Sequence, residues 1–275
     1  MLDVEFAERT DVGRTREHNE DCIGHVVPAS RQTHDDGWLF ALADGVGGQE
    51  KGEVASRLAI DTVLAEFKTI PKGIMHVSLL PKLVQQANQA VFEAGNGQSD
   101  GLQDKPEKVD PSAHMASTLI LCALRFDSAV ISHVGDSRCY LLRSGRLTCL
   151  THDHTIASEQ SRLGLASDDE EDGSPNRHIL TRSLGMDLFV AADTMTVAVL
   201  PGDVLMLCSD GLHGYVPDFV IQTELTSMSD LNGAAEALIA RANEAGGHDN
   251  VSVQLIRVRS VERMGLYRGR PYRLL

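Results

Sequence analysis

The chain has 275 residues, 42% of them hydrophobic, and a formal net charge of -14 at pH 7. This length and apolar content are enough to bury the core of one large domain. The negative charge argues against non-specific binding to nucleic acid, because the phosphate backbone would be repelled.

Membrane insertion and a disulfide framework are also disfavoured. No stretch reaches the roughly 18 to 20 apolar residues that cross a bilayer, and the first residues lack the basic and then apolar pattern of a signal peptide. Five cysteines are scattered through the sequence without a CxxC pair, which indicates buried thiols rather than disulfides or zinc ligands. We therefore expect a cytoplasmic protein with no integral membrane segment.

Apolar periodicity predicts two blocks of helix separated by strands. In chain order, the predicted elements are a strand at 38–43, helices at 53–67 and 82–94, strands at 118–124, 129–134, 139–143, 196–200 and 204–208, and helix within 217–245. Two polar stretches, 95–114 and 166–178, are typical of loops, and the second contains a dense acidic run.

Short turns between several strands indicate antiparallel hairpins, as at 126–129 and 143–146. Segregated helices with hairpin-linked strands predict an α+β fold. The strands at 118–124 and 204–208 are apolar at every position, so both of their faces must be covered. We therefore expect a four-layer α-β-β-α sandwich of two mainly antiparallel sheets, with helices on both outer faces. A doubly wound parallel sheet would need a helix between successive strands, and the hairpins exclude it.

Acidic residues recur where predicted strands end. Asp-Gly and Asp-Asn are common turn formers, so a single such acid needs no special explanation. The residues concerned are Glu20, Asp21, Asp44, Asp136, Asp210 and Asp249. If these carboxylates converge, each like-charged pair at about 4 Å repels by ~4 kcal/mol at an effective dielectric near 20. Their convergence therefore predicts bound cations.

Carboxylate oxygens select hard divalent ions, Mg²⁺ or Mn²⁺, over zinc or copper. The glycines that follow Asp44 leave room for a backbone carbonyl to reach a metal ion. We therefore interpret Asp44 as a metal ligand that bridges two ions.

Seven short motifs make the chain similar to a known family. They are RxxNED at 16–21, DGVGG at 44–48, GDSR at 135–138, DHT at 153–155, LTRSLG at 180–185, SDGL at 209–212 and HDNVS at 248–252. In order and spacing they resemble the metal-dependent protein Ser/Thr phosphatases (PPM, or type 2C), the bacterial branch above all. The similarity spans about residues 5 to 258.

The resemblance implies a role for each acid. Asp44 would bridge two ions, with the carbonyl of Gly45 on the second ion. Asp210 and Asp249 would complete the first site, and Glu20 the second. The remaining implied roles are orientation of metal-bound water by Asp21, a third and weaker ion held by Asp136, and substrate phosphate binding by the guanidinium of Arg16.

The resemblance also implies the reaction, which is hydrolysis of phosphoserine and phosphothreonine in proteins. This reaction requires no covalent phosphoenzyme intermediate. Two Mn²⁺ or Mg²⁺ ions would supply a bridging hydroxide that attacks phosphorus directly. Many eukaryotic relatives carry a histidine, proposed as the general acid, where this chain has Val46. The general acid is therefore unassigned. The expected partners are phosphorylated proteins and a cognate Ser/Thr kinase.

By the same resemblance, residues 1–258 form one catalytic domain with a flap at about 155–187. The remaining residues, 259–275, form a basic tail that we expect to be poorly structured. This tail is interpreted either as a solubilising end or as a segment that docks to an acidic partner or an anionic membrane surface. Arg177, His178 and Arg182 in the flap are near enough to suggest phosphopeptide contacts.

Three alternatives remain open. One is a catalytically silent phosphoprotein-binding pseudophosphatase, although no ligand acid is missing. Another is a stage-specific phosphatase that acts on anti-sigma-factor antagonists, with the same chemistry and different partners. The third is a zinc site at His152, Asp153 and His154, for which the first histidine of an HxHxDH pattern is missing. A polar turn is favoured for that segment.

Overall fold

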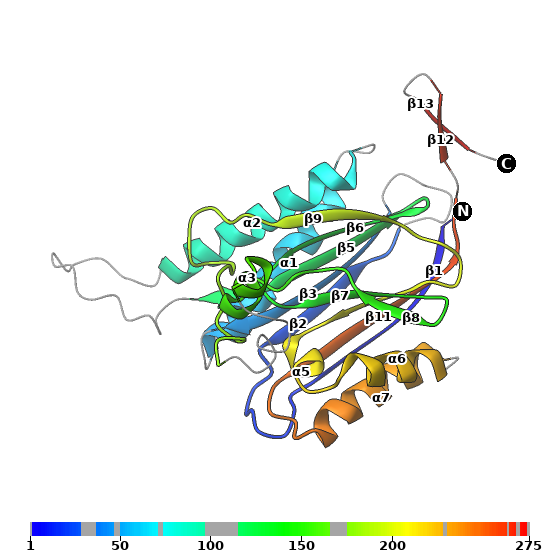
Figure 1. The fold of residues 1–275 in the computed structure, drawn as a ribbon. Coiled ribbons are helices and arrows are strands. Elements are labelled where there is room, and N and C mark those ends of the chain that lie inside the picture. Colours follow the sequence, from blue (N-terminus) through cyan, green and yellow to red (C-terminus); the bar gives the residue numbers. More distant parts are fainter. Residues whose placement is uncertain are drawn as a thin grey trace.

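Two antiparallel sheets packed face to face form the centre of the molecule, seen here in a computed structural model (Figure 1). The structure describes residues 2–28, 37–46, 50–70, 74–96, 115–165, 175–227, 230–262, 264–267 and 270–273. One sheet contains β1 (Asp3–Asp11), β7 (Arg138–Arg143), β8 (Arg146–Cys149), β10 (Val204–Cys208) and β11 (Val251–Ser260). The other contains β2 (Asp21–Val26), β3 (Trp38–Val46), β4 (Ala116–Ser117), β5 (Leu119–Arg125), β6 (Ser128–Val134) and β9 (Asp193–Ala198).

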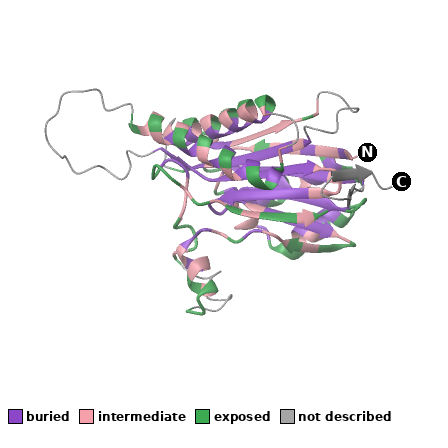
Figure 2. Cartoon of the chain, turned by 90° about the horizontal axis from the view of Figure 1, so that it is seen from above, coloured by how far each residue is buried: buried purple, intermediate pink, exposed green. Residues whose placement is uncertain are grey.

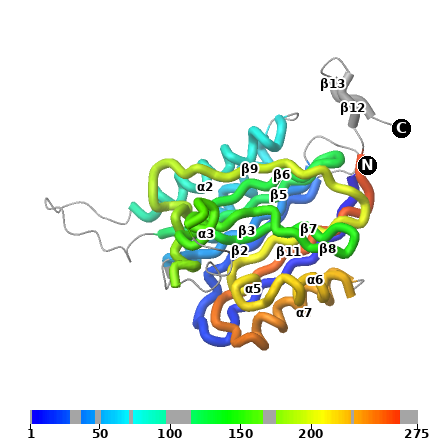
Figure 3. The backbone as a smooth tube through the Cα atoms, viewed as in Figure 1, coloured from blue at the N-terminus to red at the C-terminus, as the bar shows by residue number. Residues whose placement is uncertain are grey.

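The strand orders are β1-β11-β10-β7-β8 and β2-β3-β5-β6-β9, with β4 paired to β3. Helices lie on both outer faces of this pair of sheets (Figures 1 and 3). Helices α1 (Glu50–Thr69) and α2 (His76–Asn96) cover the second sheet, while α6 (Asp218–Ser227) and α7 (Leu231–Glu244) cover the first. Two shorter helices, α3 (Ile156–Arg162) and α5 (Asp210–His213), lie in connections.

Alternation along the central strands explains why they are apolar at every position. In β3, Leu39 and Ala41 belong to the core beneath α1 and α2, whereas Phe40 and Leu42 belong to the core between the sheets. All four side chains are fully buried, and Figure 2 shows the buried residues concentrated in the strands. A strand with two covered faces needs no polar side. The predicted four-layer α+β sandwich is confirmed.

Several predicted elements differ from the observed ones. The helical block at 217–245 is two helices, because Asp230 accepts hydrogen bonds from the backbone N–H groups of Asn232 and Gly233 and so begins α7 separately. The strand predicted at 196–200 is β9, which begins at Asp193. The pattern gave no signal for β1, which is only partly buried and pairs with β11 along its whole length.

The tail also differs from its prediction. Instead of being poorly structured throughout, it contains a hairpin of β12 (Met264–Tyr267) and β13 (Arg270–Arg273). Most of the predicted loop at 95–114 and the acidic run at 168–172 lie outside the described residues. None of the helices in the described ranges is long and apolar enough to cross a bilayer.

Candidate active site

The acids predicted from strand ends come from both sheets. Asp21 begins β2 and lies opposite Asp44, near the end of β3, in the antiparallel register. Asp136 follows β6 after one glycine. From the other sheet, Asp210 follows β10 and begins α5, and Asp249 precedes β11.

One cavity of about 350 Å³ brings most of these residues together. Carboxylates from five separate segments line it, together with the backbone of Gly45 and the side chain of Arg16. The acids in its wall are Glu20, Asp44, Asp136, Asp210 and Asp249. The structure thus gathers acids that lie up to 229 positions apart in the sequence, from Glu20 to Asp249.

Asp21 lies behind this cavity and does not line it. Its Oδ2 accepts a hydrogen bond of 2.8 Å from Ser209 Oγ, whereas its Oδ1 is buried without a hydrogen-bond partner. Burial raises the pKa of Asp21 to about 7, and the charges of Asp210 and Asp249 act in the same direction. A buried oxygen without a partner is costly unless a cation or an ordered water satisfies it.

Gly45 and Gly52 bring the β3 backbone close to Glu20. The N–H of Gly45 donates to the carbonyl of Glu20 at 3.1 Å, and a Cβ on Gly45 would lie 2.2 Å from the carbonyl oxygen of Gly52. A Cβ on Gly52 would in turn lie 2.9 Å from the carboxylate of Glu20. Sequence reasoning missed Gly52. A glycine inside a helix makes the helix less stable by roughly 1 kcal/mol relative to alanine. This glycine in α1 was therefore the available sign that another segment approaches closely at this position.

The electrostatics of the cavity show an excess of negative charge. Burial, and next the charges of neighbouring acids, raises the pKa of Asp44 and of Asp136 well above the usual carboxyl value. Burial is the largest single influence on Asp210 and acts to raise its pKa, but the contact with His178, the charges of His213 and His178 and a hydrogen bond with Asp44 together outweigh it, so that this pKa is lowered. His178 Nδ1 lies 3.7 Å from Asp210 Oδ2.

Arg16 is the main cationic partner in the cavity. Its Nη2 donates to Asp249 Oδ2 at 2.9 Å, and Asp249 Oδ1 accepts from the backbone N–H of Asn250. Asn250 also positions the segment that carries Arg16 and Glu20, since its Nδ2 donates to the carbonyls of Val12 and His18. Its Oδ1 accepts the N–H of Glu20 at 2.8 Å. Sequence reasoning missed this bridging role.

The donors fit hard divalent ions, because they are carboxylates and one glycine carbonyl. The buried Oδ1 of Asp21 also fits, as an acceptor for a water molecule that such an ion would hold. In the part of the chain that is described, no group of three Asp, Glu, His or Cys side chains is placed to hold an ion without rearrangement. Asp249 faces Arg16 and Asp21 faces Ser209, so ion binding involves an exchange of partners.

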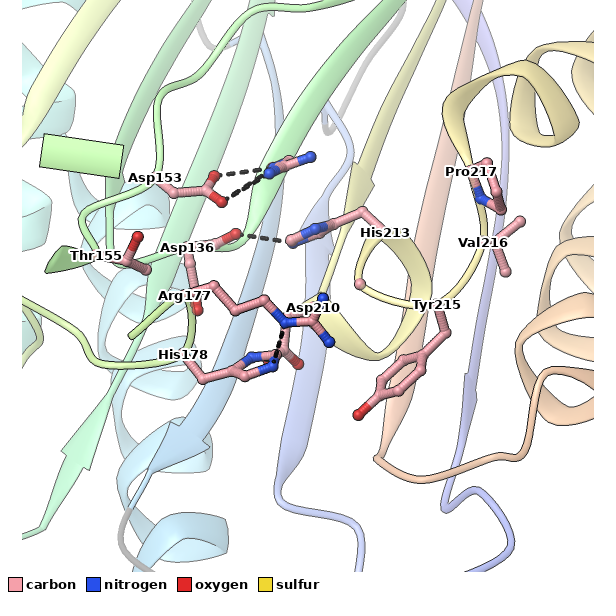
Figure 4. A pocket seen from close by; sticks show the side chains of 12 residues that line it. Asp136, Asp153, Thr155, Arg177, His178, Asp210, His213, Tyr215, Val216 and Pro217 are labelled. Carbon is pink, nitrogen blue, oxygen red and sulfur yellow. Dashed lines mark hydrogen bonds and ion pairs between the residues drawn. The ribbon is translucent and has the colours of Figure 1, made fainter. Parts of the chain in front are cut away.

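A second cavity of about 290 Å³ adjoins the first, because Asp136, His178, Asp210 and Tyr215 line both (Figure 4). Its remaining lining residues include the ion pair of Arg138 with Asp153, at 2.8 Å. The lining is otherwise mixed: Arg177, His178 and Thr155 come from the predicted flap, and the segment from His213 to Pro217 faces them.

The flap residues divide into two groups. Arg177 Nε donates to His178 Nε2 at 2.8 Å, and both side chains face the second cavity (Figure 4). Arg182 is instead paired with Asp193 and Glu159, at 2.8 and 3.2 Å. Arg182 therefore supports the flap and does not line either cavity.

The three residues considered for zinc have separate partners. Asp153 binds Arg138, and His154 Nδ1 accepts the backbone N–H of Gly135 at 3.1 Å. The side chain of His152 is exposed. The favoured polar turn with local hydrogen bonds is not what the structure shows, because the partners of Asp153 and His154 lie 15 and 19 residues away in the sequence. Val46, in the place of the histidine of many eukaryotic relatives, lines the first cavity and offers no proton.

Comparisons with known proteins agree with this geometry. The family model described as Protein phosphatase 2C matches residues 14–255. The Serine/threonine phosphatase stp of Listeria innocua is 33% identical over 265 residues, which are 95% of this chain and 97% of that protein.

Solved structures give the same result. The Mycobacterium tuberculosis serine/threonine phosphatase PstP/Ppp is 30% identical, with a TM-score of 0.79 over 94% of this chain and 100% of that one. The catalytic domain of serine threonine protein phosphatase PstP in complex with 2 manganese ions is 31% identical, with a TM-score of 0.75 over 94% and 99% of the two chains.

Proposed function

Because this chain belongs to the protein phosphatase 2C family, bacterial branch, we propose that it hydrolyses phosphoserine and phosphothreonine in proteins by direct attack of water. The observation that carries the proposal is the convergence of five carboxylates and the Gly45 backbone around one cavity, with Arg16 in its wall. As a member of this family the chain is a metal-dependent enzyme, and Mn²⁺ is the supported ion.

The proposed ligands follow the geometry of the cavity. Asp44 lines the cavity and is affected by the charges of acids from both sheets, and it is the proposed ligand shared by both ions. Asp210 and Asp249 would complete one site, and Glu20 with the Gly45 carbonyl the other. Asp21 would orient water from behind, and Asp136 would hold a third, weaker ion. Bound ions would supply water acidified to hydroxide near neutral pH and would neutralise charge on the phosphate oxygens. We propose that the same ligands can bind Mg²⁺ in place of Mn²⁺.

Arg16 is the proposed phosphate-binding residue. Its side chain is 46% exposed, and its Nη2 donates a hydrogen bond to Asp249. A planar guanidinium can hold two phosphate oxygens at once. A metal ion that takes Asp249 as a ligand would free the Arg16 guanidinium from this partner, so that it could bind the substrate phosphate.

The biological setting extends the proposal. We place a Ser/Thr kinase upstream, because its phosphorylated protein products are the substrates that this chemistry consumes. Residues 1–258 would form the catalytic domain with the flap at about 155–187, and 259–275 a basic tail that docks to an acidic partner.

Hydrolysis of a phosphothreonine peptide by the purified protein tests the proposal. Activity should appear on addition of Mn²⁺, disappear with a chelator, and be lost in Asp44→Asn. The matched control is Asp61→Asn, which makes the same change at an exposed position of α1 and should retain full activity. Hydrolysis that survives chelation, or an active Asp44→Asn protein, would contradict the proposal.

A further inference from the structure

The turn that carries Asp136 depends on a single glycine. Gly135 follows β6 with φ +103°, a conformation that side-chain-bearing residues rarely adopt. A Cβ at this position would also lie 2.6 Å from Thr118 Cγ2. Since Asp136 is the next residue, the orientation of the Gly135 peptide sets where the Asp136 carboxylate enters the cavities.

Both polar backbone groups of Gly135 are bound by His154. The N–H of Gly135 donates to His154 Nδ1 at 3.1 Å, and the carbonyl of Gly135 accepts the N–H of His154 at 3.0 Å. His154 is 1% exposed, so water does not compete for these bonds. One buried residue therefore fixes the peptide on both sides.

The ring of His154 is itself held in place. Because Nδ1 accepts a hydrogen bond, the proton of the neutral ring is on Nε2, which faces Asp193 Oδ2 at 3.4 Å. The ring stacks on His133, with centroids 4.6 Å apart and planes 19° apart. The carbonyl of His154 accepts the N–H of Thr181, on the returning arm of the flap.

We propose that His154 is a positioning residue which, through Gly135, fixes Asp136 for binding a divalent ion and ties that position to the flap. This inference rests on the proposed function, since it concerns how one of the proposed ligands is held. Partners that orient a metal ligand without touching the metal commonly change its affinity by about 10- to 100-fold when they are replaced.

Two amide substitutions separate the two sides of the ring, because each reproduces the position of one ring nitrogen only. His154→Asn places a carbonyl oxygen where Nδ1 stands and keeps the acceptor for Gly135. His154→Gln places an amide near Nε2 and removes that acceptor. His152→Gln, at an exposed position two residues earlier in the sequence, is the matched control. The same substitutions are also made in the Asp136→Asn protein, in which the metal ligand that His154 is proposed to position has been removed.

Mn²⁺ binding to the full chain, followed by titration calorimetry, is the first measurement. We expect the weakest Mn²⁺ site of His154→Gln to lose affinity by about 10-fold or more, and His154→Asn to stay within about 2-fold of the wild type. In the Asp136→Asn background, His154→Gln should cause no further change. Amide hydrogen exchange of Gly135 is the second measurement, and it should accelerate in His154→Gln but not in His154→Asn.

The inference is overturned if the two variants change Mn²⁺ binding equally, or if His154→Gln still weakens binding when Asp136 is absent. It is also overturned if Gly135 exchanges at the wild-type rate in His154→Gln. A wild-type protein that hydrolyses the phosphopeptide with Mn²⁺ while these tests fail leaves the proposed function intact. A wild-type protein without Mn²⁺-dependent hydrolysis contradicts the proposed function instead, and the exchange rate of Gly135 still decides whether His154 holds the turn.

Discussion

Asp21 lies directly opposite Asp44 in the antiparallel pairing of β2 and β3. Two acids in register on neighbouring strands are unfavourable in the absence of a cation. Here burial raises the pKa of both carboxyls. This pair of acids therefore lowers the stability of the metal-free protein. Replacing either acid should raise stability and reduce activity.

The Asp21→Asn protein should be more stable than the wild type in chelator at pH 8, by roughly 1 to 3 kcal/mol, because an unpaired buried charge is removed. The side-chain carbonyl oxygen of the asparagine can take the place of Asp21 Oδ2 and accept the hydrogen bond from Ser209. Phosphopeptide hydrolysis should fall at least about 10-fold. Urea unfolding and steady-state kinetics measure the two effects. An Asp21→Asn protein less stable than the wild type would contradict this prediction, because it would mean that other groups of the protein already stabilise the Asp21 charge without a metal ion.

The Gly52→Ala protein tests the close approach of α1 to Glu20. Alanine favours helix by about 1 kcal/mol, but its Cβ would lie 2.9 Å from the Glu20 carboxylate and 3.0 Å from the Gly45 carbonyl oxygen. We expect Mn²⁺ affinity to fall by about 10-fold. Val54→Ala, at an exposed position of the same helix, is the control and should leave Mn²⁺ affinity unchanged. Equal affinities in the two variants would argue against a role for Gly52 in the site.

The Arg16→Lys protein keeps the positive charge and loses the planar pair of donors. We expect the KM for phosphopeptide to rise by about 10-fold while Mn²⁺ affinity stays within about 2-fold, since a bidentate contact is worth about 1.5 to 3 kcal/mol. Arg57→Lys on the exposed face of α1 is the control. A change in Mn²⁺ affinity with unchanged KM would assign Arg16 to holding Asp249 rather than phosphate.

His154 gives the protein a stability that depends on pH. Burial, followed by the charge of His133, lowers its pKa from 6.5 to about 4. The folded state therefore keeps the ring neutral while the unfolded state takes up a proton, so this contribution is present above pH 6.5 and is lost as the pH falls towards 4. The loss is on the order of 2 kcal/mol after solvent screening is taken into account.

The difference in unfolding free energy between the wild type and His154→Asn isolates this effect from the acids. Measured by urea unfolding with chelator present, this difference should be constant above about pH 7. Between pH 6.5 and 4 the wild type should lose stability relative to His154→Asn. A difference that does not change with pH would mean that His154 titrates alike in the folded and unfolded states.

The layers could be predicted from the sequence because each central strand is apolar on both faces, as Phe40 and Leu42 between the sheets and Leu39 and Ala41 beneath the helices illustrate. The acids could be selected because they interrupt apolar strands at their ends. Their convergence could not be derived from spacing, since the pairing of β1 with β11 and of Asp21 with Asp44 depends on long-range register.

Supporting residues gave weaker signals. Asn250 is a single amide in a turn, and nothing local shows that it binds the carbonyls of Val12 and His18. His154 resembled a zinc ligand because it stands near Asp153 and His152, whereas its partner Gly135 lies 19 residues earlier in the sequence. Hydrogen bonds between distant segments are properties of the fold, and local pattern does not contain them.

The most direct test of the account counts the Mn²⁺ ions bound by the wild-type protein and by Asp44→Asn, from the electron paramagnetic resonance of free Mn²⁺, with phosphopeptide hydrolysis measured on the same samples. We predict two tightly bound ions in the wild type, activity that rises as they bind, and loss of both ions and of hydrolysis in Asp44→Asn. Full activity with no bound ion, or two ions and normal turnover in Asp44→Asn, would contradict it.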